Sequence, residues 1–261
     1  MKIFNFKSAA NTKEATKMAT GRATFLAGGM TLLPAIKLRL AAYSDIINIK
    51  RIKGLSGIKV SSKSIKIGAI TTHAEVASSQ EVGKSIPSLA VLADGIGDPQ
   101  VRNRGTIGGS IANNDPAADY PSACLALNAT IHTNKRKIPA DKFFKGMFET
   151  DLKKGELIES VEFEVPEKSA YAKYPNPASR YAIVGTFVAK FKKETRVAIT
   201  GAGSCVFRSK EIESALSSNF SPSAIDNVNI SSKGLNTDIH ASAEYRAHII
   251  KVMTRKAISS C

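Results

Sequence analysis

Between Arg104 and Pro121 the chain reads RGTIGGSIANNDPAADYP. Its three glycines within five positions, from Gly105 to Gly109, place several backbone amides on one concave surface, which suits an anion. No Gly-Lys-Ser/Thr follows, so this is not a Walker loop, and the spacing is not the GxGxxG of a Rossmann site. The polar stretch after it either hydrogen-bonds the hydroxyls or diphosphate of a ligand or forms a loop with local side-chain caps. The sequence therefore predicts an anion-binding loop that belongs to neither motif.

A second glycine loop lies upstream, at Ala27-Gly28-Gly29-Met30-Thr31, between a predicted strand and a predicted helix. Paired glycines let the backbone approach a phosphate closely, and a helix start presents unpaired N–H groups. The alternative is a purely structural turn, since Gly-Gly turns are common. Two separated anion sites together indicate a ligand with two phosphates and a long body.

Hydrophobic periodicity and capping signals predict a mixture of short helices and strands around these loops. Strands are expected at 4–6, 23–27, 45–49, 182–189 and 197–202, a hairpin at 58–67, and helices at 11–18, 32–38, 72 onward, 86–95, 210–216 and 243–257. The segment from Pro166 to Pro177 holds three prolines and shows no sustained period, so we expect a domain boundary there. Ser217 to Asp238 is rich in Ser and Asn and is expected to be a linker.

Composition excludes several classes of protein. The chain has 261 residues, of which 43% are hydrophobic and 23% charged, as in ordinary globular proteins of one or two domains. Neither an apolar stretch of membrane-spanning length nor the apolar core of a secretory signal is present, so we expect no membrane insertion and a cytoplasmic location. Cys124, Cys205 and Cys261 are widely separated and form no CxxC pair, so no zinc site, iron–sulfur cluster or disulfide framework is expected from them. Cys124 lies in an apolar run and is expected to be buried.

The formal net charge is +15, which fits a nucleic-acid binder, a lysine-rich surface or an acidic partner chain. The densest cluster, Lys135-Arg136-Lys137, is expected to be the solvated tip of a hairpin. With no Trp and no interleaving of basic and aromatic residues, little else favours nucleic acid. His73 follows the capping signal Thr72–Glu75, so an exposed helix-end histidine is the preferred interpretation over a ligand. His132 and His240 lie in no context suited to covalent cofactor attachment.

Taken together, these motifs resemble the FAD-binding medium subunit of the molybdenum hydroxylases, which include carbon monoxide dehydrogenase and xanthine dehydrogenase. The resemblance covers nearly the whole chain. It is carried by AGGMTLLPAIKLRL (27–40), GDPQVRNRGTIGGSIANNDPAADYP (97–121), FFKGMFET (143–150), ELI (156–158) and PASRYAIV (177–184). It implies an α+β fold in which two subdomains, about 1–55 and 56–165, form an FAD-binding domain of the vanillyl-alcohol-oxidase or PCMH type. A C-terminal domain of antiparallel strands and helices, 166–261, is then expected to follow.

The resemblance also implies roles for particular residues. The two glycine loops are expected to bind the FAD diphosphate through backbone amides, Asp119 to bond FAD hydroxyls, Ile158 to lie near the adenine and Tyr181 near the isoalloxazine. The sequence departs from the family's pattern at two side chains: Met30 stands where many relatives have histidine, and Arg180 stands where an acidic residue is frequent. The candidate cofactor-binding residues are Ala27, Gly28, Gly29, Met30, Thr31, Gly105, Thr106, Ile107, Gly108, Gly109, Asn113, Asp115, Asp119, Ile158 and Tyr181.

For function, the resemblance implies a chain that holds FAD without a covalent bond and carries electrons for a larger complex. A molybdenum-bearing large subunit would oxidise the substrate, and a small subunit with 2Fe-2S clusters would deliver electrons to this flavin, in a dimer of heterotrimers. The final acceptor would be a quinone, NAD or oxygen. No metal ligand set and no catalytic residue are expected in this chain itself. A self-contained FAD oxidoreductase on the same fold and, less favoured, a basic nucleic-acid-binding protein remain the alternatives.

Overall fold

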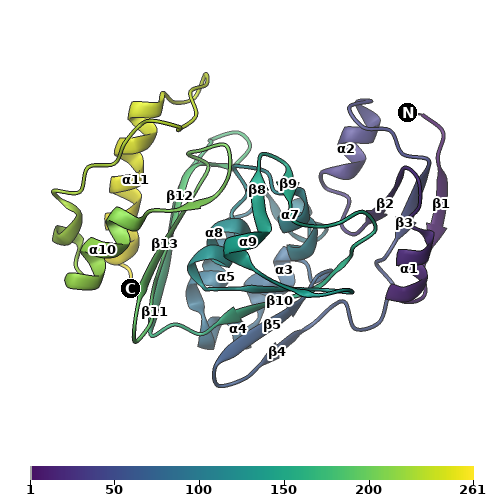
Figure 1. The fold of residues 1–261 in the computed structure, drawn as a ribbon, viewed down its shortest axis with the longest axis horizontal. Coiled ribbons are helices and arrows are strands. Elements are labelled where there is room, and N and C mark those ends of the chain that lie inside the picture. Colours follow the sequence, from purple (N-terminus) through teal and green to yellow (C-terminus); the bar gives the residue numbers. More distant parts are fainter. Residues whose placement is uncertain (1) are drawn as a thin grey trace.

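The computed structural model describes residues 2–261 as three units arranged side by side along the long axis of the molecule (Figure 1). None of the helices formed by these residues combines the length and apolar character needed to cross a membrane. The mixed α and β architecture, with an antiparallel C-terminal sheet, agrees with the fold class that the sequence predicts.

The N-terminal unit is a small parallel sheet with two crossover helices. Its strands pair in the order β1-β3-β2, and parallel pairing requires the helical crossovers that α1 and α2 provide. The Asn11 side chain accepts a hydrogen bond from Glu14 N at 2.9 Å, which is the cap expected from the sequence. The elements are β1 (Asn5–Ser8), α1 (Thr12–Met18), β2 (Ala23–Leu26), α2 (Leu32–Lys37) and β3 (Asp45–Asn48).

The central unit is a five-stranded antiparallel sheet packed against several short helices. Its strand order, β4-β5-β10-β6-β7, places the late strand β10 between β5 and β6. The hairpin at 58–67 and the helices α3 and α5 begin at the predicted signals, α3 with a complete Thr72–Glu75 capping box, whereas the other short helices of this unit were not predicted. Its elements are β4 (Ile58–Val60), β5 (Ser64–Gly68), α3 (His73–Ser78), α4 (Gln80–Ser85), α5 (Pro87–Asp94), α6 (Pro99–Arg102), α7 (Ile107–Asn113), α8 (Tyr120–Ala126), β6 (Thr130–Thr133), β7 (Lys137–Pro139), α9 (Ala140–Phe143), β8 (Phe144–Gly146), β9 (Glu149–Thr150) and β10 (Ile158–Glu164).

The C-terminal unit is a four-stranded antiparallel sheet buried on both faces. Phe187 and Ala198 face the central core, whereas Val188 and Val197 face the helices α10 and α11. This explains why β12 is mostly apolar, interrupted only by Thr186 before it ends at Lys190, as strands covered on both sides are. The elements are β11 (Lys168–Pro175), β12 (Ala182–Lys190), β13 (Thr195–Thr200), β14 (Phe207–Arg208), α10 (Lys210–Ser218), η1 (Pro222–Ile225) and α11 (Ala243–Ile258).

The segment expected to hold a domain boundary, Pro166 to Pro177, is mostly strand. β11 pairs with β12 along its whole length, and Ala170 and Ala172 bury their small side chains in the C-terminal core. The segment therefore does have a strand period, whereas the domain boundary stays a prediction. Buried and less buried residues do alternate along β11, but the buried positions are alanines. Their small side chains make the strand pattern hard to recognise from the sequence.

The basic cluster at 135–137 forms the expected hairpin turn between β6 and β7, but its arginine is not simply solvated. Arg136 Nε lies 3.0 Å from Glu156 Oε1, and Arg136 Nη1 lies 2.7 Å from Asp151 Oδ2. The three basic residues are exposed, as the solvated-tip interpretation predicts, and Arg136 in addition connects the hairpin to the segment before β10. Cys124 is fully buried, as expected.

Candidate cofactor-binding site

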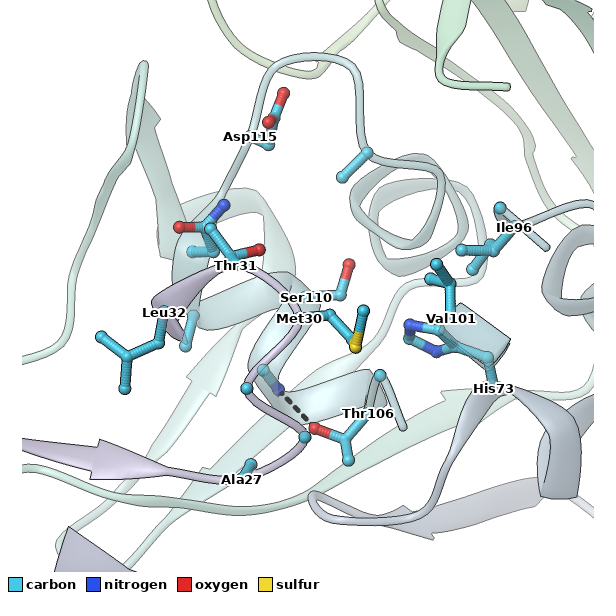
Figure 2. Close-up of a pocket in the computed structure, with 18 of the residues that line it drawn as sticks. Ala27, Met30, Thr31, Leu32, His73, Ile96, Val101, Thr106, Ser110 and Asp115 are labelled. Carbon is cyan, nitrogen blue, oxygen red and sulfur yellow. Dashed lines mark hydrogen bonds between the residues drawn. The ribbon is translucent and has the colours of Figure 1, made fainter. Parts of the chain in front are cut away.

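A cleft of about 550 Å³ lies where the three units meet, within the range of roughly 300–1,000 Å³ usual for small-molecule sites. One wall is the loop after β2, the second is formed by α3, α6 and α7, and the third is the turn between β11 and β12. Figure 2 shows side chains from the first two walls, Met30 and His73 among them, around the cleft. The cleft therefore draws on residues more than 150 positions apart in the sequence.

The first glycine loop follows directly from β2 and leads into α2. Gly29 has φ +78°, a left-handed conformation that favours glycine. The amides of Gly28, Gly29, Met30 and Thr31 donate to no acceptor among residues 2–261. A row of free amides at the wall of a cleft is the arrangement that binds an anion such as phosphate. The loop Ala27–Thr31 therefore has the free backbone amides that an anion-binding loop needs.

The second glycine loop differs, because most of its amides are already hydrogen-bonded within the protein. Gly105 N donates to Val101 O, Ile107 N to Thr71 O and Gly108 N to Ala69 O, at 2.7 to 3.1 Å. Gly109 N donates to the side chain of Thr106, the bond drawn in Figure 2. Only Thr106 N keeps no acceptor among the described residues. The expectation that Gly105–Gly109 forms an open nest of amides is therefore wrong in this structure.

Close packing explains the glycines of the second loop. A Cβ on Gly108 would lie 2.6 Å from both Cβ and O of Ala69, so α7 could not approach β5. A Cβ on Gly28 in the first loop would overlap the carbonyl of Arg104. The two loops are therefore in contact, and they can approach this closely because Gly28 has no side chain.

His73 is buried, which corrects the expectation of an exposed helix-end residue. Only 5% of its surface is accessible, and its ring packs on Tyr120 with centroids 5.3 Å apart. Burial, helped by the charge of Arg102, lowers the pKa of His73 to about 4, so the imidazole is neutral at pH 7. The cap signal predicted the helix start correctly, but local sequence could not show that Tyr120 covers this position.

Asp119 is buried below the cleft and is already partnered. Its Oδ1 accepts from the hydroxyl of Tyr171 and lies 3.0 Å from Lys173 Nζ. Burial raises the pKa of Asp119, while Lys173 and the Tyr171 hydroxyl oppose that rise. Both partners come from β11, so this carboxylate joins the C-terminal sheet to the cleft whatever else it binds.

The C-terminal sheet also holds the loop before Asp119. Thr200 Oγ1 donates to Ala118 O at 2.6 Å, and Gly201 N donates to Pro116 O at 2.8 Å. Ala182 N donates to the intervening Ala117 O at 3.3 Å. Three successive carbonyls are thus fixed by β12, β13 and the residue after β13. The C-terminal unit is part of the cleft's construction.

The turn between β11 and β12 forms the remaining wall. Arg180 has φ +62° and donates from Nη1 to Gly97 O at 3.1 Å, which closes the turn over the α5–α6 segment. Tyr181 is 45% exposed and lines the cleft, and burial of its hydroxyl raises its pKa. Tyr181 is therefore a protonated phenol at neutral pH, placed beside the space that a ligand would fill.

The cleft gathers most of the residues that the sequence singles out. Three of them do not line it: Ile107 and Gly108 lie beneath the loop surface, and Ile158 is buried in the central core on β10. The proximity of Ile158 to an adenine stays a prediction. The predicted residues that line the cleft are Ala27, Gly28, Gly29, Met30, Thr31, Gly105, Thr106, Gly109, Asn113, Asp115, Asp119 and Tyr181.

Sequence reasoning missed other parts of the cleft wall. Ile96 and Gly97 lie in the turn between α5 and α6, and Ser110 lies on α7 one residue after the glycine pair. The Gly95–Gly97 signal marks a turn but says nothing about what that turn faces. Its proximity to Arg180 depends on pairing between segments 83 residues apart.

The residues present fit a ligand that carries a diphosphate. Free amides of the first loop supply donors, and the glycine contact between the loops brings the backbone close. Nowhere in residues 2–261 do three His, Cys, Asp or Glu side chains gather as a metal site would require. The fold and the cleft thus define a class of protein that holds a phosphate-bearing cofactor between small α/β units.

Comparison with known proteins identifies the family. Residues 2–167 match the family described as FAD binding domain in molybdopterin dehydrogenase, and the chain belongs to it. It is 35% identical to the glyceraldehyde dehydrogenase medium chain of Sulfolobus acidocaldarius, across 97% of this chain and 96% of that protein. It is 38% identical to the carbon monoxide dehydrogenase medium chain of Hydrogenophaga pseudoflava, across 71% of this chain and 69% of that protein.

Solved structures agree with this assignment. A carbon monoxide dehydrogenase structure from Hydrogenophaga pseudoflava, which lacks the Mo-pyranopterin moiety of its molybdenum cofactor, superimposes with a TM-score of 0.90 at 31% identity. The match covers 99% of this chain and 96% of that one. The chain is therefore an FAD-binding oxidoreductase subunit of the molybdenum hydroxylase type, as its sequence motifs indicate.

Proposed function

We propose that this subunit carries electrons between an iron–sulfur partner and an external acceptor, with FAD bound in the cleft. The observation that supports this most is the loop Ala27–Thr31, which lines the cleft at its contact with the second loop and in which the amides of Gly28 to Thr31 have no acceptor among residues 2–261. The diphosphate would lie on these amides, with Thr106 N at the second loop's edge. Asn113, Asp115 and Asp119 would face the hydroxyl-bearing part of the cofactor.

When bound, FAD supplies a ring that exchanges electrons one or two at a time, whereas the protein supplies binding and orientation. Met30 and Tyr181 line the cleft from opposite units and would limit the access of water to it. Tyr181, whose pKa is raised, stays a neutral hydrogen-bonding phenol across the physiological range. The Arg180–Gly97 bond would hold this tyrosine in place.

The partners would be a molybdenum-bearing large subunit and a small subunit with 2Fe-2S clusters, assembled as a dimer of heterotrimers in the cytoplasm. Support comes from relatives named as medium chains or subunits of such enzymes, including the nicotine 6-hydroxylase medium subunit of Paenarthrobacter nicotinovorans. The acceptor would be a quinone, NAD or oxygen. The charge of +15 would be matched by acidic partner surfaces, which steer association at low salt.

We also propose a domain division near residue 165, with residues 1–165 binding the cofactor and 166–261 forming the C-terminal domain. Its support is the start of β11 at Lys168 and the separate C-terminal core on the outer face of that sheet. The inner face contributes to the central core, so the two parts would unfold together.

Purified chain loaded with FAD provides the test. Denaturation should release all of the flavin, and FMN should bind more weakly because it lacks the diphosphate. The loaded chain should pass electrons from an artificial reductant to a quinone dye but should not reduce its flavin with carbon monoxide, purines or aldehydes. Addition of the two partner subunits should restore flavin reduction by the substrate of the complex. Substrate-driven bleaching of the flavin in the isolated chain would instead establish a self-contained oxidoreductase.

A further inference from the structure

His73 lies at the junction of the two glycine loops. Its backbone N donates to Gly105 O at 3.0 Å, and its ring packs so tightly on Gly105 that a Cβ there would lie 2.5 Å from Nε2. Gly28 of the first loop lies close to the backbone of Arg104 and Gly105. The imidazole is therefore fixed within the same small region as the amides proposed to bind a diphosphate.

Neither ring nitrogen of His73 has a hydrogen-bond partner among residues 2–261. Nδ1 is sealed from solvent without a partner, and Nε2 on the Gly105 side forms no bond to a described side chain or backbone group. Because the residue lines the cleft, a ligand in that cleft is the available partner.

The surroundings decide which nitrogen carries the proton. The neutral imidazole has one donor and one acceptor. Buried N–H groups without an acceptor are rarer than unpaired acceptors, so the sealed Nδ1 is better left as a lone pair. The proton then lies on Nε2, beside the second loop. Nε2–H is a donor at a place where four of the five loop amides already have acceptors.

We infer that His73 is a cofactor-binding residue that donates a hydrogen bond from Nε2 to the diphosphate of FAD. This inference rests on the proposed function, since it takes FAD as the occupant of the cleft. The first loop supplies backbone donors on one side of the diphosphate, and His73 supplies a side-chain donor on the other. A histidine outside both glycine motifs thus completes the phosphate site.

The test measures FAD affinity of the full-length apo-protein by quenching of flavin fluorescence. His73→Leu keeps an apolar body of similar reach but removes the donor, and it should weaken FAD binding about 10- to 100-fold, the equivalent of one charge-assisted hydrogen bond. His73→Gln carries an amide N–H near the Nε2 position and should recover most of that loss. His73→Asn places its amide near Nδ1 and should resemble the leucine variant.

Riboflavin, which has the same ring but no phosphate, tests where the bond is made. Its affinity should be equal in wild type and His73→Leu. Equal FAD affinity in wild type and His73→Leu, or equal losses for FAD and riboflavin in a folded variant, would overturn the inference while leaving FAD binding intact. Wild-type protein that binds no FAD would overturn the proposed function as well.

Nitrogen-15 NMR of the wild-type histidines gives a readout that does not depend on any variant folding. His73 should show the Nε2–H tautomer in the apo-protein, and its Nε2 signal should shift on addition of FAD but not of riboflavin. A His73 spectrum that is unchanged by FAD would contradict the inference.

Discussion

The loop Ala27–Thr31 and the loop Gly105–Gly109 have similar glycine-rich sequences, but their backbone amides have different partners. Four consecutive amides of the first loop are free at the cleft, whereas four of the second are bonded within the protein. Gly108 lets α7 lie on Ala69, and Gly28 lets the first loop lie on the second. A glycine-rich motif in a binding site can therefore serve the ligand, the packing beneath it, or the contact between the two.

The largest expected effect is that of Gly108→Val. The new side chain would overlap Ala69 backbone and side-chain atoms, and overpacking of this kind costs about 1–3 kcal/mol or more of unfolding free energy. Urea denaturation of the apo-protein measures this loss directly. Gly83→Ala is the matched control, since Gly83 lies in α4 with no heavy atom within 4 Å of the added Cβ, and it should leave stability unchanged or raised. An apo-protein of normal stability that has lost FAD would mean that Gly108 faces the ligand.

Gly28→Ala should act on the ligand rather than on the fold. Its Cβ would overlap the Arg104 carbonyl, so the loops must separate and the free amides move away from the second loop. We expect FAD affinity to fall at least about 10-fold, equivalent to ~1.4 kcal/mol, with a smaller change in apo stability. Titration of FAD into the folded variant measures the first, and urea denaturation the second. A stability loss as large as that of Gly108→Val would remove the distinction drawn between the loops.

A third prediction uses an ion-pair network away from the cleft. Glu156 is 4% exposed, and although burial opposes it, hydrogen bonds from Arg136, Lys153 N and Thr133 lower its pKa to about 2. The pKa of this carboxyl is lower in the folded protein than its value of 4.5 in the unfolded chain, so its charged form stabilises the fold at pH values above 4.5. That stabilisation is lost as the pH falls from 4.5 towards 2. Glu156→Gln should therefore remove on the order of 2 kcal/mol at pH 7 and much less near pH 2.

The measurement is the free energy of unfolding against pH, by urea titration of both proteins. FAD affinity at pH 7 should stay within a few-fold of wild type, because Glu156 does not line the cleft. A large loss of affinity in the folded variant would show that stability anywhere in the central unit controls the site, and would weaken the contrast between the loops.

The smallest effect is expected for Gly29→Ala. At φ +78° an L-residue is disfavoured by about 1–2 kcal/mol, and the new Cβ would meet the flexible ends of Leu33 and Leu26 at 2.9–3.1 Å. FAD affinity and apo stability should both fall modestly, because the strained backbone would relax and turn the amides. Crystallography of the variant should show a rotated peptide at position 29. An unrotated peptide with normal affinity would contradict the role given to this conformation.

Local signals predicted much of the fold from the sequence. The caps at Asn11 and Thr72 begin helices where expected, and both glycine loops and Tyr181 lie at one cleft. Part of what failed depends on distant residues: two amides of the second loop, those of Ile107 and Gly108, donate to Thr71 and Ala69, more than 30 positions earlier. Sequence shows that glycine is required at a position but not whether backbone, side chain or ligand occupies the space.

The same limit applies to the burial of His73 and to β11. A histidine after a helix cap is usually exposed, and only the return of the chain at Tyr120 covers this one. In β11 the pairing partner is what reveals a strand, because alanines give little hydrophobic contrast against lysines. In both cases the structure depends on tertiary contacts that the local sequence does not show.

The bonds from Thr200 and Gly201 to the carbonyls of Pro116 and Ala118 have a consequence for biosynthesis. A ribosome makes the glycine loops early, but the segment that carries Asp119 gains these anchors only after residue 201 has emerged. Truncated chains that end before β13 should therefore be unable to retain the flavin, even though every residue of both glycine loops is present. We therefore expect cofactor loading to follow completion of the chain through its C-terminal sheet.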